Sequence, residues 1–345
     1  MTDEKRQLSF QAFRHVGLAI DPIHVGTGGA RLGRVDNTIV RDPVTRVPKI
    51  PGSSLAGVHR AYAAMAYEDE RDVQGTRKTP YYPNCAGQGQ SDERASDGMS
   101  KEHCGESNCP VCAVFGRASF AGLAAFSDAQ VLLFPVASRE GPVWVTSPSA
   151  LAQVGASPSV DEANQDKAHR GGAKTSVNLG WLQLEAVAWS GFQKHTEALT
   201  LCGLNATTLP PLSIVENLVL VSDKLFGHIV NSNLEVRTSV AINPATGAAE
   251  DGALFTYEAI PRGTIVTWEV TCRDPRHFKH VKNGALSDRS PHVTKLDHVH
   301  EVAAKAHPFL GALGIGGMGT RGMGRIKVLT SASAPATGTT RGDAK

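Results

Sequence analysis

The apolar positions near the N-terminus form a strand-like run, a glycine-rich break and then a helical stripe. Residues 10–23 carry partly alternating apolar side chains, which predicts a β-strand. The segment 28–33, GGARLG, is too rich in glycine for a helix and predicts a loop whose backbone can approach a ligand closely. Apolar residues then recur at helical spacing over 58–65, which predicts a helix with Ser53 or Ser54 as its N-cap.

Short apolar runs predict further strands through the middle of the chain. The segments that carry them are 131–134, 142–148, 177–189 and 217–231. The first is expected to end at Pro135, and the third is long enough for a hairpin. In the last, Ser222 is expected to cap a short helix that follows the strand. The polar stretch 155–176 predicts a loop.

The C-terminal part of the chain contains the clearest hairpin. Two β-rich runs within 234–262 flank the turn 243–247, where a glycine suits a positive φ angle. A helix is expected at 296–306, and a second glycine loop with basic residues at 311–329 leads into a short strand. The tail 330–345 is small and polar, which predicts disorder.

The order of these elements indicates an α+β protein. A basic glycine loop lies near each end of the chain, which suggests a plait of helices and strands with both loops beside the same sheet. Large apolar side chains are almost lacking between Glu68 and Glu106, so residues 67–112 read as an insertion. The expected core therefore comprises 10–66 and 113–329.

Composition narrows the class of protein. With 345 residues, of which 41% are hydrophobic, the chain can bury one large core with insertions or two smaller cores. It has no apolar run long enough to span a membrane and no secretory signal pattern at its start, so we expect a cytoplasmic protein that makes no membrane contact. The net charge of +2 does not indicate a generally basic nucleic-acid protein.

Charge is nevertheless concentrated in one block. Residues 24–60 hold six basic side chains and two acidic ones, an excess larger than that of the whole chain. A helix that begins beside a glycine loop is a ready anion site. The glycine loop at 314–324 lacks the Gly-Lys-Ser/Thr ending of a P-loop, and a strand rather than a helix follows it, so a nucleotide-binding motif is disfavoured.

Four of the six cysteines lie within the insertion and indicate a metal site. Cys85, Cys104, Cys109 and Cys112 suit a tetrahedral structural Zn²⁺ site, which would stabilise a segment without its own core. The wide gap before Cys104 leaves His103 as a possible substitute ligand. The alternative is unmetallated thiols or a redox Cys-x-x-Cys pair, although no thioredoxin-like context surrounds it.

The sequence blocks at both ends of the chain resemble a known family. PGSSLAGVHR and LGIGGMGTRGMGRIKV are similar to the paired signatures of the RAMP superfamily of CRISPR-associated proteins. Further blocks resemble the backbone subunit of type III effector complexes, nearest to the fourth subunit of the Cmr (type III-B) complex, with the Csm-type backbone subunit as a close sibling. They are HVGTG, VDNTIVRDPVTRVPKIPGSSLAG, LLFPVASREGPVWVTSP, LVLVSDKLF and LEVRTSVAINPATGAAEDGALFTYEAIP.

This resemblance implies a fold and a function. The fold would be an RRM-related, ferredoxin-like core, with the hairpin at 234–262 as a thumb. The protein would polymerise along a CRISPR RNA and cleave bound target RNA once per subunit, with a divalent cation such as Mg²⁺. Its other partners would be further copies of itself, the large polymerase-like subunit and the small subunits. Two alternatives are a catalytically idle RNA-binding scaffold and a ribonuclease that processes guide precursors.

The resemblance also implies site residues. Asp36 would be catalytic, with His24 and Glu258 as possible partners. Without the resemblance, Asp36 could equally cap a turn or pair with Arg34 or Arg41, and His24 could make a structural hydrogen bond. The residues expected to contact RNA are Gly28, Gly29, Arg31, Lys49, Ser53, Ser54, Arg60, Gly316, Gly317, Gly319, Arg321 and Arg325. Ala56 stands where relatives commonly carry a phosphate-contacting lysine.

Overall fold

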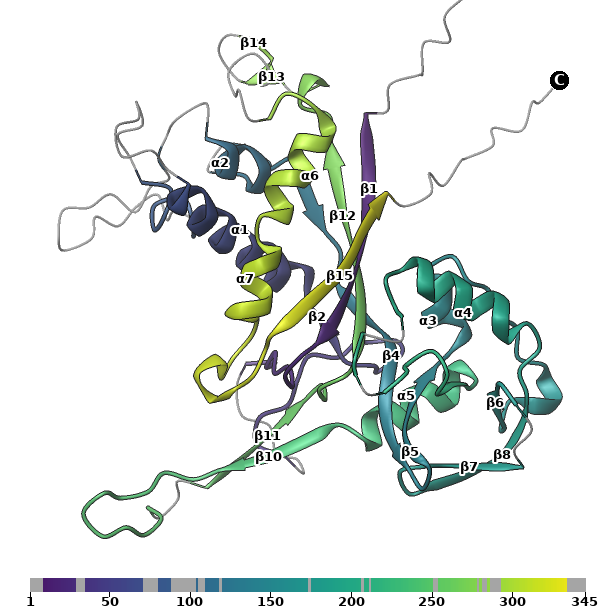
Figure 1. Cartoon of the computed structure of the whole chain (residues 1–345). Helices are drawn as coiled ribbons and strands as arrows, with labels where there is room; N and C mark the ends of the chain where they lie inside the picture. The colour runs from purple at the N-terminus through teal and green to yellow at the C-terminus, as the bar shows by residue number, and fades with distance from the viewer. Residues whose placement is uncertain are drawn as a thin grey trace, which may run out of the picture.

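The computed structural model contains a central antiparallel sheet with helices on one face, a second lobe and a projecting hairpin (Figure 1). It describes residues 9–28, 35–70, 80–87, 104, 109–117, 120–172, 175–205, 208–210, 212–250, 254–277, 279–280, 284–285 and 293–333. Of the residues expected to contact RNA, Gly29 and Arg31 lie outside these ranges, as does the alternative metal ligand His103.

The central sheet has the strand order of a ferredoxin-like fold. Its strands run β15-β1-β12-β4, and each is antiparallel to its neighbour. They are β1 (Phe10–Ala19), β4 (Ala129–Ser138), β12 (Ile265–Arg273) and β15 (Ile326–Ser333). Helix α1 (Gly52–Asp69) follows β1, and α6 (Leu296–Ala304) with α7 (His307–Ala312) follows β12. All three helices lie on the same side of the sheet (Figure 1), and the predicted α+β class and ferredoxin-like core are confirmed.

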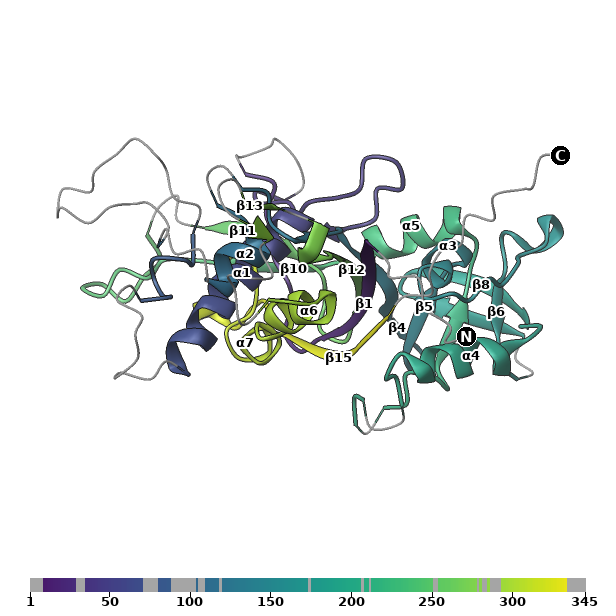
Figure 2. The same cartoon turned by 90° about the horizontal axis from the view of Figure 1, so that it is seen from above.

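A second lobe is inserted between β4 and β12, and it was not expected as a separate unit. Its strands continue the sheet from β4 in the order β5-β9-β6-β8-β7. They are β5 (Gly141–Thr146), β6 (Ala168–Arg170), β7 (Ser176–Leu179), β8 (Leu182–Ala188) and β9 (Leu218–Leu220). The helices of this lobe are α3 (Pro148–Ala152), α4 (Phe192–Leu201) and α5 (Asp223–Ser232). Figure 2 shows the lobe beside the core rather than stacked on it.

Two local predictions in this lobe are wrong. β4 does not end at Pro135, because that residue pairs with Trp144 of β5. The pairing of β4 with β12 ends at Leu133. Proline has no N–H to donate, and at position 135 it therefore interrupts no hydrogen bond to β12. The expected loop at 155–176 contains β6, which pairs with β8 and β9. Ser222 does cap α5, as predicted, by accepting a hydrogen bond from the Leu225 N–H at 3.5 Å.

The predicted hairpin is present at the base of the central sheet. Strand β10 (Glu235–Ser239) pairs with β11 (Phe255–Ala259) in antiparallel register, and Gly247 in the connecting turn has a φ angle of 68°. Figure 1 shows the hairpin reaching away from both lobes. The remaining short elements are β2 (Lys49–Ile50), α2 (Pro110–Phe115), β3 (Ala124–Phe126), η1 (Glu162–Asn164), η2 (Pro275–His277), β13 (Lys279–His280), β14 (Gly284–Ala285) and η4 (Gly319–Arg321).

Apolar clusters support the core, the second lobe and the junction between them. Trp268 of β12 and Leu55 of α1 belong to the cluster between the central sheet and its helices, and both are almost fully buried. Trp144 and Leu132 belong to a cluster that also includes Val16 of β1, so it joins the central sheet to the second lobe. Phe134 and Phe226 belong to a further cluster, to which β4 also contributes.

The start of α1 differs from the prediction. Pro51 occupies the N-cap position, and neither Ser53 nor Ser54 caps the helix. Instead, the Gly52 N–H donates to Oδ1 of Asp128 at 2.8 Å. The carboxylate of Asp128, just before β4, therefore accepts the hydrogen bond from the helix N-terminus that a serine hydroxyl was expected to accept. Ser53 is exposed and Ser54 half-buried in the first turn.

The boundaries of the insertion and of the tail also shift. α1 continues to Asp69, and α2 begins at Pro110, inside the expected insertion 67–112. The tail was expected to begin at 330, but β15 extends to Ser333 and pairs with β1 through Thr330 and Ser331. Residues 334–345 lie outside the described residues. Within the described part of the chain, no helix is long and apolar enough to cross a membrane.

Candidate functional site

Asp36 is an exposed carboxylate held by the base of the hairpin. Its Oδ2 accepts hydrogen bonds from the N–H of Thr256 at 2.7 Å and from the Thr256 hydroxyl at 2.9 Å. These bonds, that from the backbone first, lower the pKa of Asp36. The charged form is thereby favoured, so the side chain presents a persistent negative charge to solvent. Neither Arg41 nor a turn N–H within the described residues takes this carboxylate.

The backbone next to Asp36 continues the same attachment. Asn37 forms a parallel bridge with Tyr257, with its N–H bonded to the Thr256 carbonyl at 3.0 Å and its carbonyl bonded to the Glu258 N–H at 3.0 Å. The segment after the first glycine loop is thus fixed along β11 by main-chain bonds. This pairing places Asp36 opposite Thr256, two residues before Glu258 on β11.

His24 lies beneath the same strand. Its Nδ1 is 2.6 Å from the carbonyl oxygen of Glu258, and its ring packs edge-on against Tyr257 with centroids 5.8 Å apart. A carbonyl only accepts, so Nδ1 carries the proton and Nε2 is the acceptor in the neutral ring. His24 is 7% exposed, so it is a buried neighbour of the site rather than a surface residue.

Glu258 is engaged by an arginine. Its Oε2 accepts from Nη2 of Arg41 at 2.8 Å, and the two side chains are 14% and 17% exposed. Arg41 also donates through Nε to Asn231 of α5 at 2.9 Å and through Nη1 to the carbonyl of Ile39 at 3.1 Å. Glu258 is therefore a partner of a structural cation, and Asp36 is the exposed carboxylate of the pair.

The second glycine loop closes the site from the C-terminal side. The N–H of Gly317 donates to the carbonyl of His24 at 2.9 Å. At Gly316, which has a φ angle of 88°, a Cβ atom would lie 2.3 Å from that carbonyl, so only glycine permits the approach. The second glycine loop thus contacts His24, just before the first loop, but residues 29–34 of the first loop lie outside the described residues, so the expected meeting of both loops beside one sheet stays a prediction.

The same loop also packs against the hairpin. Met318 and Met323 lie against Phe255, Tyr257 and Ala259 in a small apolar cluster. The guanidinium of Arg321 lies over the ring of Phe255 at 5.6 Å and donates to the Ser239 hydroxyl at 3.3 Å. Gly319 and Arg321 are exposed, and so is Gly28 of the first loop. One side of the hairpin base therefore carries the second glycine loop with Arg321, a residue that was expected to contact RNA.

Three of the expected basic contacts are occupied by other groups. Arg60 is 4% exposed, and its guanidinium donates to the carbonyls of Cys85 at 2.7 Å and Gly116 at 2.8 Å. The expectation that Arg60 contacts RNA is therefore wrong, because the insertion covers that face of α1. Lys49 pairs with Asp128 at 2.6 Å, and Arg325 pairs with Asp21 through two bonds of 2.5 and 3.0 Å.

The hairpin displays apolar side chains to solvent. Val236 and Val240 lie on or beside β10, Ile242 follows towards the turn, and Leu254 precedes β11. Their exposed fractions are 53%, 43%, 55% and 65%. Large apolar residues along a thin projecting element are typical of a binding surface.

The four cysteines of the insertion converge. The sulfurs of Cys85, Cys104, Cys109 and Cys112 lie within 4.8 Å of one another, and three of these residues are buried. Hydrogen bonds from Cys104 and the other thiols, together with burial, raise the pKa of Cys109 and Cys112. Four sulfurs this close can ionise together only around a cation. The cluster therefore could hold a metal ion such as Zn²⁺.

Sequence reasoning missed Arg41 and Thr256 as organising residues. The sequence suggests Arg41 only as a possible partner of Asp36, and it predicts no role for Thr256. The signal available was the alternation along β11, which places Thr256 and Glu258 on the same face of that strand, opposite Tyr257. It did not reveal that the strand would face the segment after Asp36, since 220 residues separate Asp36 from Thr256.

Comparison with known proteins shows the family of this chain. The model of the RAMP superfamily matches residues 18–327. The CRISPR system Cmr endoribonuclease Cmr4 of Pyrococcus furiosus is 27% identical over 273 residues, which cover 72% of this chain and 78% of that protein. The CRISPR system Cms endoribonuclease Csm3 of Streptococcus thermophilus is 36% identical over 72 residues, or 20% of this chain and 30% of that relative. That alignment thus spans less than a third of its length.

Solved structures share the fold. Oligomeric Cmr4 from Pyrococcus furiosus superimposes with a TM-score of 0.56 at 18% identity, covering 94% of this chain and 100% of that one. A chain of the Type III-B Cmr-beta complex bound to cognate target RNA gives a TM-score of 0.55 at 17% identity, covering 92% and 96%. With the family match over most of its length, the chain belongs to the RAMP superfamily.

Proposed function

We propose that this protein is a backbone subunit of a type III CRISPR effector that binds the guide RNA and cleaves target RNA paired to it. The observation that carries the proposal is the exposed Asp36, held by Thr256 at the base of the hairpin, against which the second glycine loop packs. The relatives named as endoribonucleases support it, as does the shared fold with a complex bound to target RNA.

The surface around Asp36 suits RNA of any sequence. Exposed glycine backbone at Gly28, Gly317 and Gly319 can approach phosphates, and Arg321 adds a cation. These groups recognise the phosphodiester backbone rather than base edges. The exposed apolar residues of the hairpin would insert between bases, as wedge residues do in other nucleic-acid complexes.

Cleavage would follow the chemistry of RNA transesterification. The 2′-oxygen bonds to the adjacent phosphorus while the bond from phosphorus to the 5′-oxygen breaks. The 2′-proton leaves to an acceptor, the 5′-oxygen gains a proton, and the products are a 2′,3′-cyclic phosphate and a 5′-hydroxyl. Because its pKa is lowered, Asp36 is a weak proton acceptor at neutral pH and is better suited to positioning and charge stabilisation. His24, whose Nδ1 is bonded to the Glu258 carbonyl, would assist in orientation or proton transfer.

A divalent cation fits these residues. Magnesium commonly binds through one or two carboxylates together with substrate phosphate oxygens. Asp36 offers one exposed carboxylate, whereas Glu258 is taken by Arg41. Bound at Asp36, Mg²⁺ would neutralise charge on the phosphate. We also propose that the cysteine cluster holds a structural Zn²⁺ and that Glu258 positions rather than reacts.

In this proposal, the protein acts in the cytoplasm as part of a larger assembly. Several copies would follow one guide, together with the large polymerase-like subunit and the small subunits. The fold shared with an oligomeric Cmr4 supports self-association.

The test of this assembly uses the full-length chain with and without a guide RNA. Sedimentation and electron microscopy should show a guide-dependent filament whose length grows with the RNA, and labelled complementary RNA should bind to it. A chain that stays monomeric and binds no RNA would refute the proposal. Target RNA that is bound but never cut, with or without Mg²⁺, would leave a scaffold subunit instead.

A further inference from the structure

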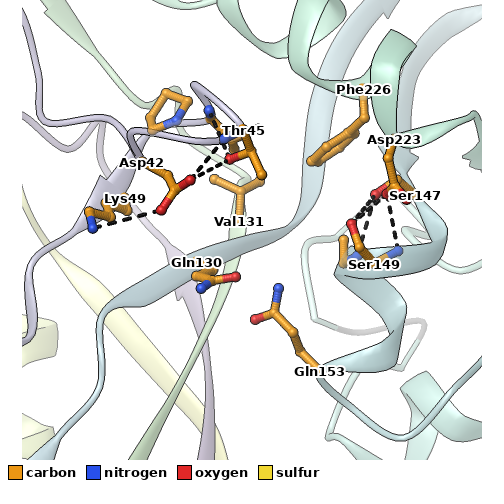
Figure 3. A pocket seen from close by; sticks show the side chains of 13 residues that line it. Asp42, Thr45, Lys49, Gln130, Val131, Ser147, Ser149, Gln153, Asp223 and Phe226 are labelled. Atoms are coloured by element: carbon orange, nitrogen blue, oxygen red, sulfur yellow. Dashed lines mark hydrogen bonds and ion pairs between the residues drawn. The ribbon is translucent and has the colours of Figure 1, made fainter.

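A pocket separate from the Asp36 surface lies between the core and the second lobe. It has a volume of about 130 Å³ and is lined by residues 42–49, by β4, by α3 with the residues at its two ends, and by the start of α5. Its lining residues are Asp42, Thr45, Val47, Pro48, Lys49, Gln130, Val131, Ser147, Ser149, Ala150, Gln153, Asp223 and Phe226. Figure 3 shows these side chains on opposite sides of the opening.

The pocket is connected to the candidate site through one short segment. Arg41, which holds Glu258, directly precedes Asp42 of the pocket wall. Asn231 of α5 donates to the Arg46 carbonyl at 3.1 Å and accepts from Arg41 at 2.9 Å. The pocket wall is therefore anchored, through Arg41 and Asn231, to α5 and to Glu258 at the hairpin base.

The charges of the pocket exclude a phosphate ligand. Lys49 is the one cation among the residues that line it, and Asp128 holds its ammonium group at 2.6 Å. Asp42 accepts from the Thr45 N–H at 2.9 Å, and Asp223 accepts from the Ser149 N–H at 3.1 Å and from the Ser149 hydroxyl. Two carboxylates beside a neutralised lysine would repel a phosphate group.

The remaining groups suit a flat neutral ring. Phe226, Val131 and Ala150 are buried and supply apolar contact. The side-chain amides of Gln130 and Gln153 approach one another across the opening in Figure 3. An amide both donates and accepts, so it can pair with the edge of any nucleobase. At about 130 Å³ the pocket is slightly smaller than a cavity of about 150 Å³ that holds benzene, so it can take in one ring of a base while the sugar and phosphate stay outside the opening.

We propose that this pocket receives one unstacked nucleobase of the bound RNA. The ring lies against Phe226 and Val131, and its polar edge meets Gln130 and Gln153. This inference rests on the proposed RNA-binding function. It adds a second point of contact, at which the chain holds a base rather than the phosphodiester backbone. Because the amides of Gln130 and Gln153 can each donate and accept a hydrogen bond, this contact would tolerate any base.

The experiment uses the full-length chain assembled on guide RNAs that each carry one abasic nucleotide, walked along the sequence. Stacking of one base on protein side chains changes affinity by about fivefold or more. In the native protein we expect a recurring position, once per bound subunit, at which loss of the base weakens binding by at least about fivefold. The readout is fluorescence anisotropy of labelled RNA.

A blocking variant and a matched control make the test specific. Gln153→Phe places a ring over the opening, and Gln153 makes no side-chain hydrogen bond among the described residues. Gln183→Phe is the same change on the exposed face of β8, away from the pocket. We expect Gln153→Phe to abolish the abasic sensitivity and Gln183→Phe to retain it, with equal melting temperatures for the two variants.

Each other outcome overturns the inference in a recognisable way. If RNA binds but no abasic position matters, or if Gln153→Phe keeps the sensitivity, the pocket does not hold a base. If Gln153→Phe instead prevents self-association, the pocket holds a side chain of a neighbouring copy. If the native chain binds no RNA, the proposed function fails together with this inference.

Discussion

Asp36 and Thr256 are joined by two hydrogen bonds to one carboxylate oxygen, although 220 residues separate them in the chain. The contact links the segment after the first glycine loop to the strand that forms the base of the hairpin. Any movement of the hairpin is therefore transmitted directly to the exposed carboxylate.

Thr256→Val removes the hydroxyl donor and keeps the backbone N–H. Because residues that orient a reactive carboxylate typically contribute about 10-fold to 100-fold to activity, we expect target cleavage to slow by about 10-fold while RNA binding is unchanged. Thr256→Ser should restore the rate. Thr238→Val is the matched control, since Thr238 lies opposite on β10 and is exposed. Equal slowing by both valine variants would argue against the contact.

The same variant predicts a change in pH dependence. Thr256 lowers the pKa of Asp36, so the native carboxylate stays charged into mildly acidic solution. Removing the hydroxyl should raise that pKa, and the acid limb of the cleavage profile should move to higher pH. Single-turnover rates measured across pH test this. A shift to lower pH would contradict the assigned role of Thr256.

The pair formed by Arg41 and Glu258 should behave as a structural unit. Removing either partner leaves a half-buried charge, so we expect Arg41→Met or Glu258→Leu to destabilise the fold by about 1 to 3 kcal/mol, less than for fully buried pairs. The double variant should recover part of that loss. Denaturant unfolding of all four proteins gives the coupling energy. Additive losses would show that the two side chains do not interact.

Metal binding to the cysteine cluster should support the insertion. The purified chain is expected to contain Zn²⁺ in equal stoichiometry, and Cys112→Ser should lose it and lower the melting temperature. Cys202→Ser is the control, because Cys202 lies in another apolar cluster. Elemental analysis and the absorption spectrum of the Co²⁺-substituted protein supply readouts independent of RNA. Full metal content in Cys112→Ser would refute the assignment.

Buried histidines between the central sheet and its helices should make the fold sensitive to acid. Burial lowers the pKa of His15 to about 2, of His307 to about 3 and of His59 to about 4. The unfolded chain binds protons near the ordinary pKa of 6.5. The three neutral histidines therefore do not destabilise the fold above that pH, and each destabilises it increasingly as the pH falls from 6.5 to its own lowered pKa. Each histidine should cost about 2 kcal/mol at pH 5.

His15→Phe tests this directly. Both ring nitrogens of His15 are buried without a hydrogen-bond partner among the described residues, and the ring stacks on Trp268. Phenylalanine should keep the packing, leave stability at neutral pH equal or higher, and reduce the loss between about pH 7.5 and pH 5. His228→Phe, at an exposed position on α5, should leave that loss unchanged. Identical pH dependence in both variants would contradict the account.

Much of the core could be predicted from sequence because its signals are local. The strand at 10–23, the helix after the Pro-Gly turn and the hairpin at 234–262 each have a period or a turn residue that specifies them. The second lobe could not be predicted in the same way. Strands such as β6 and β9 have only three residues each, too few to show alternation.

The site was predictable only in part. The resemblance to RAMP proteins indicated His24, Asp36 and Glu258, and the structure brings them to one strand. It could not indicate that Arg41 would engage Glu258, because that contact depends on tertiary pairing. The burial of Arg60 likewise follows from the insertion folding over α1, which no pattern within the helix reveals.

The most direct test of the central claim is cleavage of target RNA by the complex assembled on guide RNA, comparing the native chain with Asp36→Asn in the presence of Mg²⁺. Asparagine keeps the shape and removes the charge. We predict regularly spaced cuts that disappear in the variant while target binding and filament length stay equal. Cuts of unchanged rate and spacing in Asp36→Asn would contradict the assignment of catalysis to this residue.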